Sequence, residues 1–356
     1  MAKDRDLSFD AFRGFAITAV IGIHAAYSGF PVRTFSNHWW NFPLLVAYCQ
    51  LLNFAVPVFF FISGYWTSKK RIESWEDYKI FLLNRFSRLL IPYFFWSVIL
   101  LMFAAIREHK IDVCQMAFKL MTGRATAPYY FVIVLVQLYI LTPLLHYINR
   151  RRVGIVLVIV FNVLSLFALY LSRVFHVICP LPRMLPFYTW IIFFEIGLWI
   201  GMREDKLDNK KVSLKDLRLF ILPALVICLL ISVLEGVILL TKYGNLYFAL
   251  APIKYSSFLF SVCVIMGFLS IREHLRCYPK FLVTLGNYSF GIYLVHMIIL
   301  KPVAGLLQRS DIVYSLQPLY QLLLVFITMS ICVLAISISR RLFPKFFCSK
   351  ILGFCS

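Results

Sequence analysis

The chain has 356 residues, of which 61% are hydrophobic and only 15% are charged, and its mean hydropathy is +0.83. A water-soluble globular domain has roughly half apolar and about a quarter charged residues, so this composition excludes an ordinary soluble enzyme. The apolar residues come in blocks of about 20, the helix length that crosses the ~30 Å hydrocarbon core of a bilayer. The sequence therefore predicts a polytopic membrane protein and excludes a disordered or fibrous one.

Ten apolar blocks are predicted to be transmembrane helices, and in chain order they are 9–29, 44–66, 89–106, 129–148, 153–171, 185–202, 218–240, 255–271, 285–306 and 320–339. The sixth is marginal in length, and Lys301-Pro302 interrupts the ninth. The segments between them are too short for a separate soluble domain, so residues 1–356 are predicted to form a single all-α transmembrane domain. The first block is too long, and too polar at its start, for a cleaved signal peptide, and it is expected to remain as a membrane helix.

The net charge of +20 also has a topological interpretation. When the N-terminus is placed in the cytoplasm, most of the 36 lysines and arginines fall in cytoplasmic segments. The positive-inside rule then predicts that both termini are cytoplasmic, as an even number of spans requires. Basic inner loops of this kind face the anionic inner leaflet of membrane lipids, so no nucleic-acid partner is predicted.

The nine cysteines show neither a CxxC motif nor a zinc-type spacing, so no metal site is predicted. Most of them lie in or inside the membrane, which is typical of packing residues in a reducing compartment. Cys114 and Cys179 fall in predicted outer loops, where a disulfide between them is an open alternative.

The first predicted span contains two ionisable residues, Arg13 near its inner end and His24 deep within it, and Asp10 precedes them. His24 is eleven positions after Arg13, which is about 1100° of rotation, or three turns plus ~20°, and about 16 Å along the axis. The two side chains therefore share one face of the helix. One interpretation is that Arg13 reaches the lipid headgroups and that His24 packs in the core. However, two ionisable groups on one face of a membrane helix are more typical of residues that line a cavity.

A basic inner loop from Thr67 to Arg88 ends in Arg85-Phe86-Ser87-Arg88. If a helix starts here, the two arginines at i and i+3 share a face and can bind a phosphate group with their guanidinium planes. The alternative is that they only anchor the topology of the following span.

Two further motifs lie at helix ends. Phe59 to Trp66 closes the second span and contains Ser63-Gly64, which suits an interfacial aromatic belt or a close approach of helices. The stretch from Leu285 to His296 enters the ninth span with a glycine and carries a histidine about a third of the way through it.

Other polar residues are predicted to be buried within the spans, namely Asn53, Gln137, Asn162, Glu195 and Glu235. We expect the amides to form hydrogen bonds between helices. Glu195 lies in the middle of its span, where it suits the orientation of a histidine or the carriage of a proton.

Together these motifs resemble acyltransferase family 3, a family of integral membrane O-acyltransferases. The matching elements are Asp10-x-x-Arg13-Gly14 with Arg-x10-His to His24, Phe-Phe-x-x-Ser63-Gly64, Arg85-x-x-Arg88 before Pro92, and Gly286-x-x-Ser289-x-x-x-Tyr293-Leu294-x-His296. They occur in the family's order and extend over most of the chain. Asn84-Arg85 stands where the family often has a doubled arginine.

The resemblance implies transfer of an acyl group, most often acetyl, from acyl-CoA to a hydroxyl of a lipid-linked or nascent envelope polysaccharide. It implies a multi-pass protein of the bacterial inner membrane, of the stand-alone type without a fused hydrolase-like domain, and with no tightly bound cofactor. His24 and Arg13 are then the expected catalytic residues. The resemblance implies donor-binding residues at Ser63, Gly64, Arg85 and Arg88 and supporting residues at Asp10, Glu195, Tyr293 and His296.

A histidine desolvated in the membrane is expected to be neutral near pH 7, which suits His24 to act as a base or as a covalent carrier of the acyl group. Arg13, Arg85 and Arg88 then hold the charged end of the donor. A transporter or flippase is the main alternative, but its matched broken helices in two halves of the chain are not found. A second alternative is a membrane scaffold for a polysaccharide synthase. That function would not explain why Arg13 and His24 share one helix face.

Overall fold

The computed structural model describes residues 6–29, 41–109, 111–150, 154–177, 187–209, 214–272, 278–310 and 317–354. Within these ranges the chain is almost entirely helical and contains no strand. Eight helical segments of the described chain are long and apolar enough to cross a membrane, and a ninth arises if the pair α6 (Tyr130–Ile140) and α7 (Thr142–Asn149), bent by 54°, is one span. The predicted class, a polytopic all-α membrane protein, is confirmed.

The prediction of ten spans differs from this result at the sixth. Residues 187–202 form part of a helix, α9 (Phe187–Asn209), but the described part of this helix is not among those long and apolar enough to cross. Glu195 lies in its middle and a run of charged residues ends it, which lowers its hydropathy. The ninth predicted span is not interrupted at Lys301-Pro302, because α13 (Lys280–Leu307) continues through Pro302.

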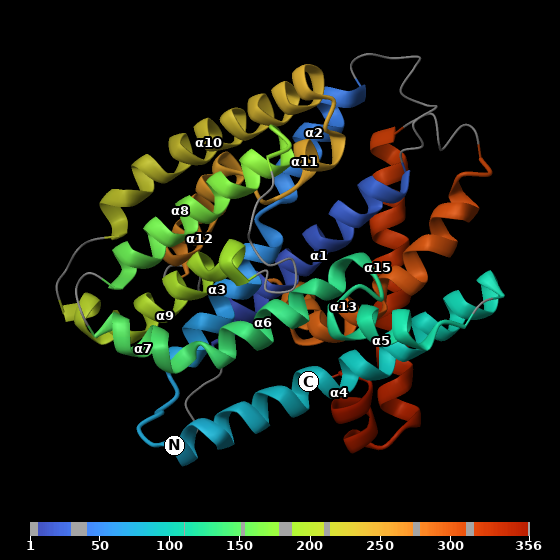
Figure 1. The fold of residues 1–356 in the computed structure, drawn as a ribbon, viewed down its shortest axis with the longest axis horizontal. Helices are drawn as coiled ribbons and strands as arrows, with labels where there is room; N and C mark the ends of the chain where they lie inside the picture. Colours follow the sequence, from blue (N-terminus) through green and yellow to red (C-terminus); the bar gives the residue numbers. More distant parts are fainter. Residues whose placement is uncertain are drawn as a thin grey trace.

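The centre of the bundle is occupied by helices from both ends of the chain (Figure 1). Its central helices are α1 (Leu7–Gly29), α3 (Ala55–Ser68), α9 and α13. Around them lie α4 (Trp75–Glu108), α8 (Gly154–Arg173), α10 (Leu214–Tyr243) and α15 (Gln317–Leu342). Of the apolar window of α1, 78% is buried, compared with 17% for α10, so α1 belongs to the core and α10 to the lipid-facing layer.

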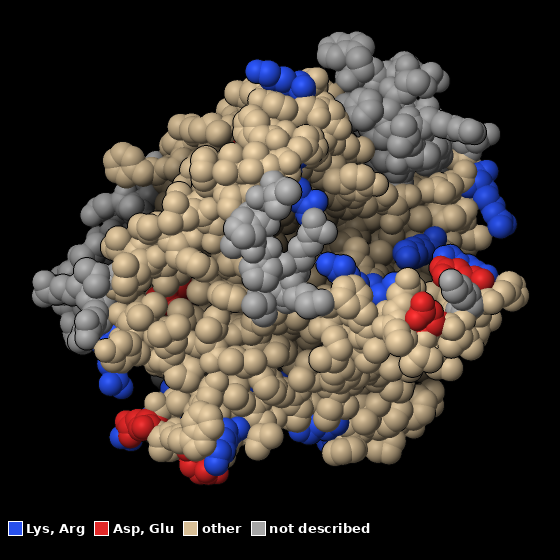
Figure 2. All heavy atoms as spheres, viewed as in Figure 1, with Lys and Arg blue, Asp and Glu red and all other residues tan. Residues whose placement is uncertain are grey.

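The shorter elements complete the walls of the bundle, and they are α2 (Asn41–Leu52), α5 (Val113–Met121), η2 (Ala127–Tyr129), α11 (Leu246–Leu250), α12 (Tyr255–Ile271) and η3 (Phe347–Ile351). Figure 2 shows that most of the face viewed there carries neither basic nor acidic side chains. The charged ones gather at its lower left, where α4 begins in Figure 1, and at its right. The exposed leucines and phenylalanines of the outer helices, such as Leu164, Leu230 and Phe326, are the surface expected to face lipid tails.

Helices α1 and α13 touch through their backbones. A β-carbon on Gly14 would overlap with the carbonyl oxygen of Leu282, and one on Gly286 would overlap with the carbonyl oxygen of Asp10. Small residues permit this close packing in membrane helices, where van der Waals contact replaces a hydrophobic driving force. The pairing of Gly14 with Gly286 at one level, and of two histidines further along both helices, shows that the helices run parallel.

Helices α3 and α9 are paired in the same way. A β-carbon on Gly64 would overlap with the carbonyl oxygen of Phe194, and one on Gly197 would overlap with that of Phe61. Phe60 and Phe61 are fully buried, so this aromatic motif forms core contacts rather than an interfacial belt. The structure thus gives Gly64 a packing role.

The segment from Thr67 to Arg88, predicted to be an inner loop, is in part helical, because α4 begins within it at Trp75. The Ser74 hydroxyl accepts a hydrogen bond from the amide of Asp77, whose carboxylate accepts one from the Ser74 amide in return, and such a capping box starts a helix. The helix then continues through Pro92 to Glu108. Its 34 residues extend about 51 Å, longer than a ~30 Å hydrocarbon core, so the basic pair lies within a helix rather than at its start.

The buried amides join helices, as predicted. The Asn53 amide donates to the carbonyl oxygen of Leu250 in α11, and the Asn162 amide donates to those of Tyr188 and Thr189 in α9. The amide oxygen of Gln137 accepts from the backbone N–H of Phe187. These bonds satisfy polar groups that would otherwise be costly to bury in an apolar bundle.

The alternative of a disulfide between Cys114 and Cys179 stays a prediction. Cys114 is exposed near the start of α5. Cys179 lies outside the described residues.

Gly286→Ala is expected to destabilise the protein by about 1–3 kcal/mol, because its β-carbon forces α1 and α13 apart. Gly305→Ala in the same helix is the matched control, since nothing lies within 4 Å of a β-carbon there and alanine favours a helix. Thermal unfolding of the detergent-purified variants measures both effects. Equal stability of the two variants would contradict the close contact.

Candidate active site

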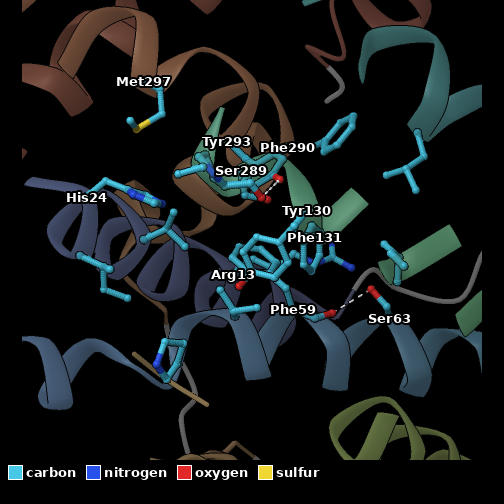
Figure 3. A pocket seen from close by; sticks show the side chains of 18 of the residues that line it. Arg13, His24, Phe59, Ser63, Tyr130, Phe131, Ser289, Phe290, Tyr293 and Met297 are labelled. Atoms are coloured by element: carbon cyan, nitrogen blue, oxygen red, sulfur yellow. Dashed lines mark hydrogen bonds between the residues drawn. The ribbon is translucent and has the colours of Figure 1, made fainter. Parts of the chain in front are cut away.

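A cavity of about 700 Å³ runs through the middle of the bundle. Side chains from α1, α3, α4, η2, α6, α11 and α13 line it, together with Pro252, which follows α11. Figure 3 shows several of them converging on the cavity. One end contains Arg13, Arg85 and Asn287, and the other contains Ser28 and Tyr247. Since Arg13 and Ser28 lie fifteen residues apart on α1, the cavity follows that helix for about 22 Å.

His24 lies on the wall of this cavity together with Arg13. Its imidazole projects from α1 toward α13 (Figure 3), where the centre of its ring is 5.3 Å from that of His296. The predicted common face of Arg13 and His24 is thus the face that α1 turns to the cavity, and it does not point into lipid.

His296 is fully buried behind His24, and its hydrogen bonds define which nitrogen carries a proton. Nδ1 lies 2.7 Å from the carbonyl oxygen of Tyr293 and 3.1 Å from that of Ile292. Carbonyl oxygens only accept, so Nδ1 must carry the hydrogen. The neutral ring then has an unshared electron pair on Nε2, which has no hydrogen-bond partner within the described ranges.

Two tyrosines tie α13 to η2 beside this histidine. The hydroxyl of Tyr293 donates to the carbonyl oxygen of Pro128, and the hydroxyl of Tyr129 donates over 2.7 Å to that of Leu294. Tyr293 also lines the cavity. The predicted supporting residue Tyr293 is therefore placed where it fixes the cavity wall.

Of the predicted arginine pair, only Arg85 lines the basic end of the cavity. Arg85 lines the cavity and lies over the ring of Tyr139 at 5.2 Å and that of Phe81 at 5.5 Å. Arg88 is exposed and is not among the lining residues. Positions i and i+3 lie about 60° apart around a helix, which is enough to turn one side chain inward and the other outward. Arg88 therefore does not share the cavity with Arg85, and their joint binding of a phosphate stays a prediction.

Asp10 holds Arg13 at the same end. Nη1 of Arg13 lies 3.2 Å from Oδ1 of Asp10, and the Asp10 side chain is almost fully buried while the Arg13 side chain is 30% exposed. An ion pair one turn apart on a helix orients the longer side chain. The ion pair with Asp10 therefore holds the Arg13 side chain where it lines the cavity.

Ser63 and Glu195 differ in their relation to the cavity. Ser63 lines it, and its hydroxyl donates over 2.8 Å to the carbonyl oxygen of Phe59. Glu195 is fully buried away from the lining residues, and its polar neighbours are Asn149 and Arg203. The predicted role of Glu195 in orienting a cavity histidine is not supported by its position, and Gly64 is likewise absent from the wall.

Sequence reasoning missed the far end of the cavity. Tyr27, Tyr130, Tyr247 and Pro252 line it, and only their aromatic or cyclic character marks them in the sequence. The segment that carries Tyr247 and Pro252 is held by Lys254, which is fully buried.

The ammonium group of Lys254 donates to three oxygens. It lies 3.0 Å from the amide oxygen of Gln50, 2.9 Å from the carbonyl oxygen of Ala249 and 2.8 Å from that of Ala251. These bonds use all three N–H groups of a lysine. They connect α2 to the chain around α11 and so fix the segment that carries Tyr247 and Pro252.

A family model described as an acyltransferase domain matches residues 6–337, nearly the whole chain. The chain belongs to acyltransferase family 3. Neither the curated proteins nor the solved structures contain a match. The family membership shows a membrane acyltransferase.

In this acyltransferase the residues of the matching motifs divide into two physical classes. Gly14, Gly64 and Gly286 allow helices to touch. Arg13 and His24, like Ser63, Ser289 and Tyr293, direct their side chains to one cavity. The glycines therefore build the shape of the site, and the polar residues give it chemistry.

Substitution by cysteine tests whether the cavity of this acyltransferase is open to water. Ser63→Cys is expected to react with a small charged thiol reagent, because residue 63 lines the cavity. Thr67→Cys, one turn along α3, is the matched control, since Thr67 is fully buried outside the cavity. Label is counted by mass spectrometry in a Cys114→Ala background, and equal labelling of both positions would contradict the cavity.

Proposed function

We propose that this protein transfers an acyl group, foremost acetyl, from acyl-CoA to a hydroxyl of an envelope polysaccharide in the bacterial inner membrane. The observation that carries the proposal is that one cavity contains two guanidinium groups at one end and His24 further along α1. The axial distance of about 16 Å from Arg13 to His24 suits an elongated donor better than two groups acting on one atom.

The donor end is proposed to be the end with Arg13 and Arg85, on the predicted cytoplasmic side. The face of the Arg85 guanidinium is covered by Tyr139, which leaves its N–H edge for the phosphate oxygens of CoA, the geometry in which arginine binds phosphate. The pantetheine arm then extends along α1 and brings the thioester to His24. A volume of about 700 Å³ is within the range of pockets for small molecules.

His24 is proposed to act as the general base. The acceptor oxygen attacks the thioester carbonyl carbon while His24 takes the hydroxyl proton. The carbon–sulfur bond then breaks, and the CoA thiolate takes that proton back from His24. The products are an O-acyl ester and free CoA thiol, and His24 returns to its neutral form.

The acceptor is proposed to enter from the opposite end, at Tyr27 and Tyr247. Tyr247 is 80% exposed and Tyr27 is 40% exposed. Tyrosine combines a flat apolar ring with a hydroxyl, which suits the apolar faces and hydroxyl edges of a sugar. The polysaccharide class itself rests on the family resemblance.

His24→Ala is expected to lower acyl transfer by about 10²–10⁴-fold, the usual contribution of a positioned base. The measurement is transfer of radiolabel from acetyl-CoA to envelope polysaccharide by the protein in lipid nanodiscs. His109→Asn is the control, since His109 ends α4 far from the cavity lining in a left-handed conformation that asparagine tolerates.

Full activity of His24→Ala would remove the base from the proposal. Movement of the glycan across a vesicle membrane by a wild-type protein that transfers no radiolabel would support the transporter or flippase instead.

Arg85→Met is expected to raise the KM for acetyl-CoA by roughly 10–100-fold, because a charge-assisted hydrogen bond contributes about 1.5–3 kcal/mol. Arg88→Met, three residues along the same helix, is expected to leave that KM unchanged, because Arg88 faces away from the cavity. Steady-state kinetics with varied donor distinguish the two. An equal rise in both variants would show that the phosphates bind outside the cavity.

A further inference from the structure

The two histidines of the site meet because of a matched spacing in two helices. His24 lies ten residues after Gly14 on α1, and His296 lies ten residues after Gly286 on α13. Since the glycines form the contact between parallel helices, ten residues bring both histidines about 15 Å along the bundle to the same height. Their rings are 5.3 Å apart, centre to centre, and tilted by 40°.

The surroundings of His296 hold its ring in one orientation. Its Nδ1–H group donates to two carbonyl oxygens of its own helix, and the Tyr293 ring packs 6.1 Å away. Turning the ring over would break both bonds. Nε2 therefore keeps its electron pair and has no partner in the described part of the chain, although an unbonded buried polar atom normally costs about 1–3 kcal/mol.

This electron pair matches a need of the proposed reaction. When His24 takes the hydroxyl proton, it becomes an imidazolium with an N–H group on each nitrogen, and burial makes that cation costly. One N–H group points to the reacting atoms, and the other needs an acceptor. The described residues contain no group of three metal-ligating side chains, so a metal site made by both histidines lacks a third ligand there.

We propose that Nε2 of His296 accepts a hydrogen bond from His24 as its imidazolium forms during acyl transfer. His296 is a positioning residue in this step: it gains no proton and loses none, and the hydroxyl proton passes by way of His24 to the CoA thiolate. The role deepens the proposed function and rests on it. It resembles the part played by the carboxylate in a Ser-His-Asp triad, with a neutral imidazole as the acceptor.

Two variants separate this role from simple packing. His296→Leu fills the space without an acceptor, whereas His296→Gln places an amide oxygen near the position of Nε2. We expect the leucine variant to lower kcat on the order of 100-fold with an unchanged KM for the donor, as for loss of an interaction made only in the transition state. The glutamine variant is expected to recover about tenfold of that loss.

A second measurement does not need acyl transfer. Diethyl pyrocarbonate acylates a neutral imidazole through a cationic transition state, and mass spectrometry of the peptide with His24 gives its rate. This rate is expected to fall about tenfold in His296→Leu and to recover in His296→Gln.

The outcomes are distinguishable. Unchanged modification of His24 in the leucine variant, or a loss of equal size in both variants, overturns the role of His296. Slower modification together with no acyl transfer by the wild-type protein supports the histidine pair and overturns the proposed function.

Discussion

The contact between the backbones of α1 and α13 is the constraint on which the site depends. Gly14 and Gly286 remove the side chains that would separate these helices, whereas helices that pack through larger side chains lie about 8–10 Å apart. Because the two helices run parallel, the contact brings the face with Arg13 and His24 beside the part of α13 that ends in His296. The cavity forms where α3, α4 and α6 close around that pair.

Other buried polar residues form hydrogen bonds, because an unbonded polar group in an apolar interior is costly. Asn53, Asn162 and Lys254 each donate to backbone carbonyls of another segment or of a helix end. The carboxylate of Glu235 accepts from the hydroxyls of Tyr170 and Ser256. These bonds hold elements in place, while the side chains that line the cavity are the ones available to a substrate.

Features confined to one helix were predictable. The common face of Arg13 and His24 follows from helical periodicity, and the helical class and most spans follow from blocks of apolar residues. Predictions that needed a neighbour were less successful. Arg88 shares a helix with Arg85 but not its cavity, and α4 begins at Trp75 because Ser74 caps it, ahead of the apolar residues that mark the span.

Hydropathy, charge and residue spacing were sufficient to predict a membrane helix bundle, most of its helices and the polar residues within them. These are properties of single segments of the chain. The meeting of His24 with His296, the inward turn of Arg85 and the position of Tyr247 at the far end of the cavity came from packing alone. Such contacts join segments that are distant in sequence. They depend on how closely the helices pack, and the periodicity of a single helix does not determine that packing.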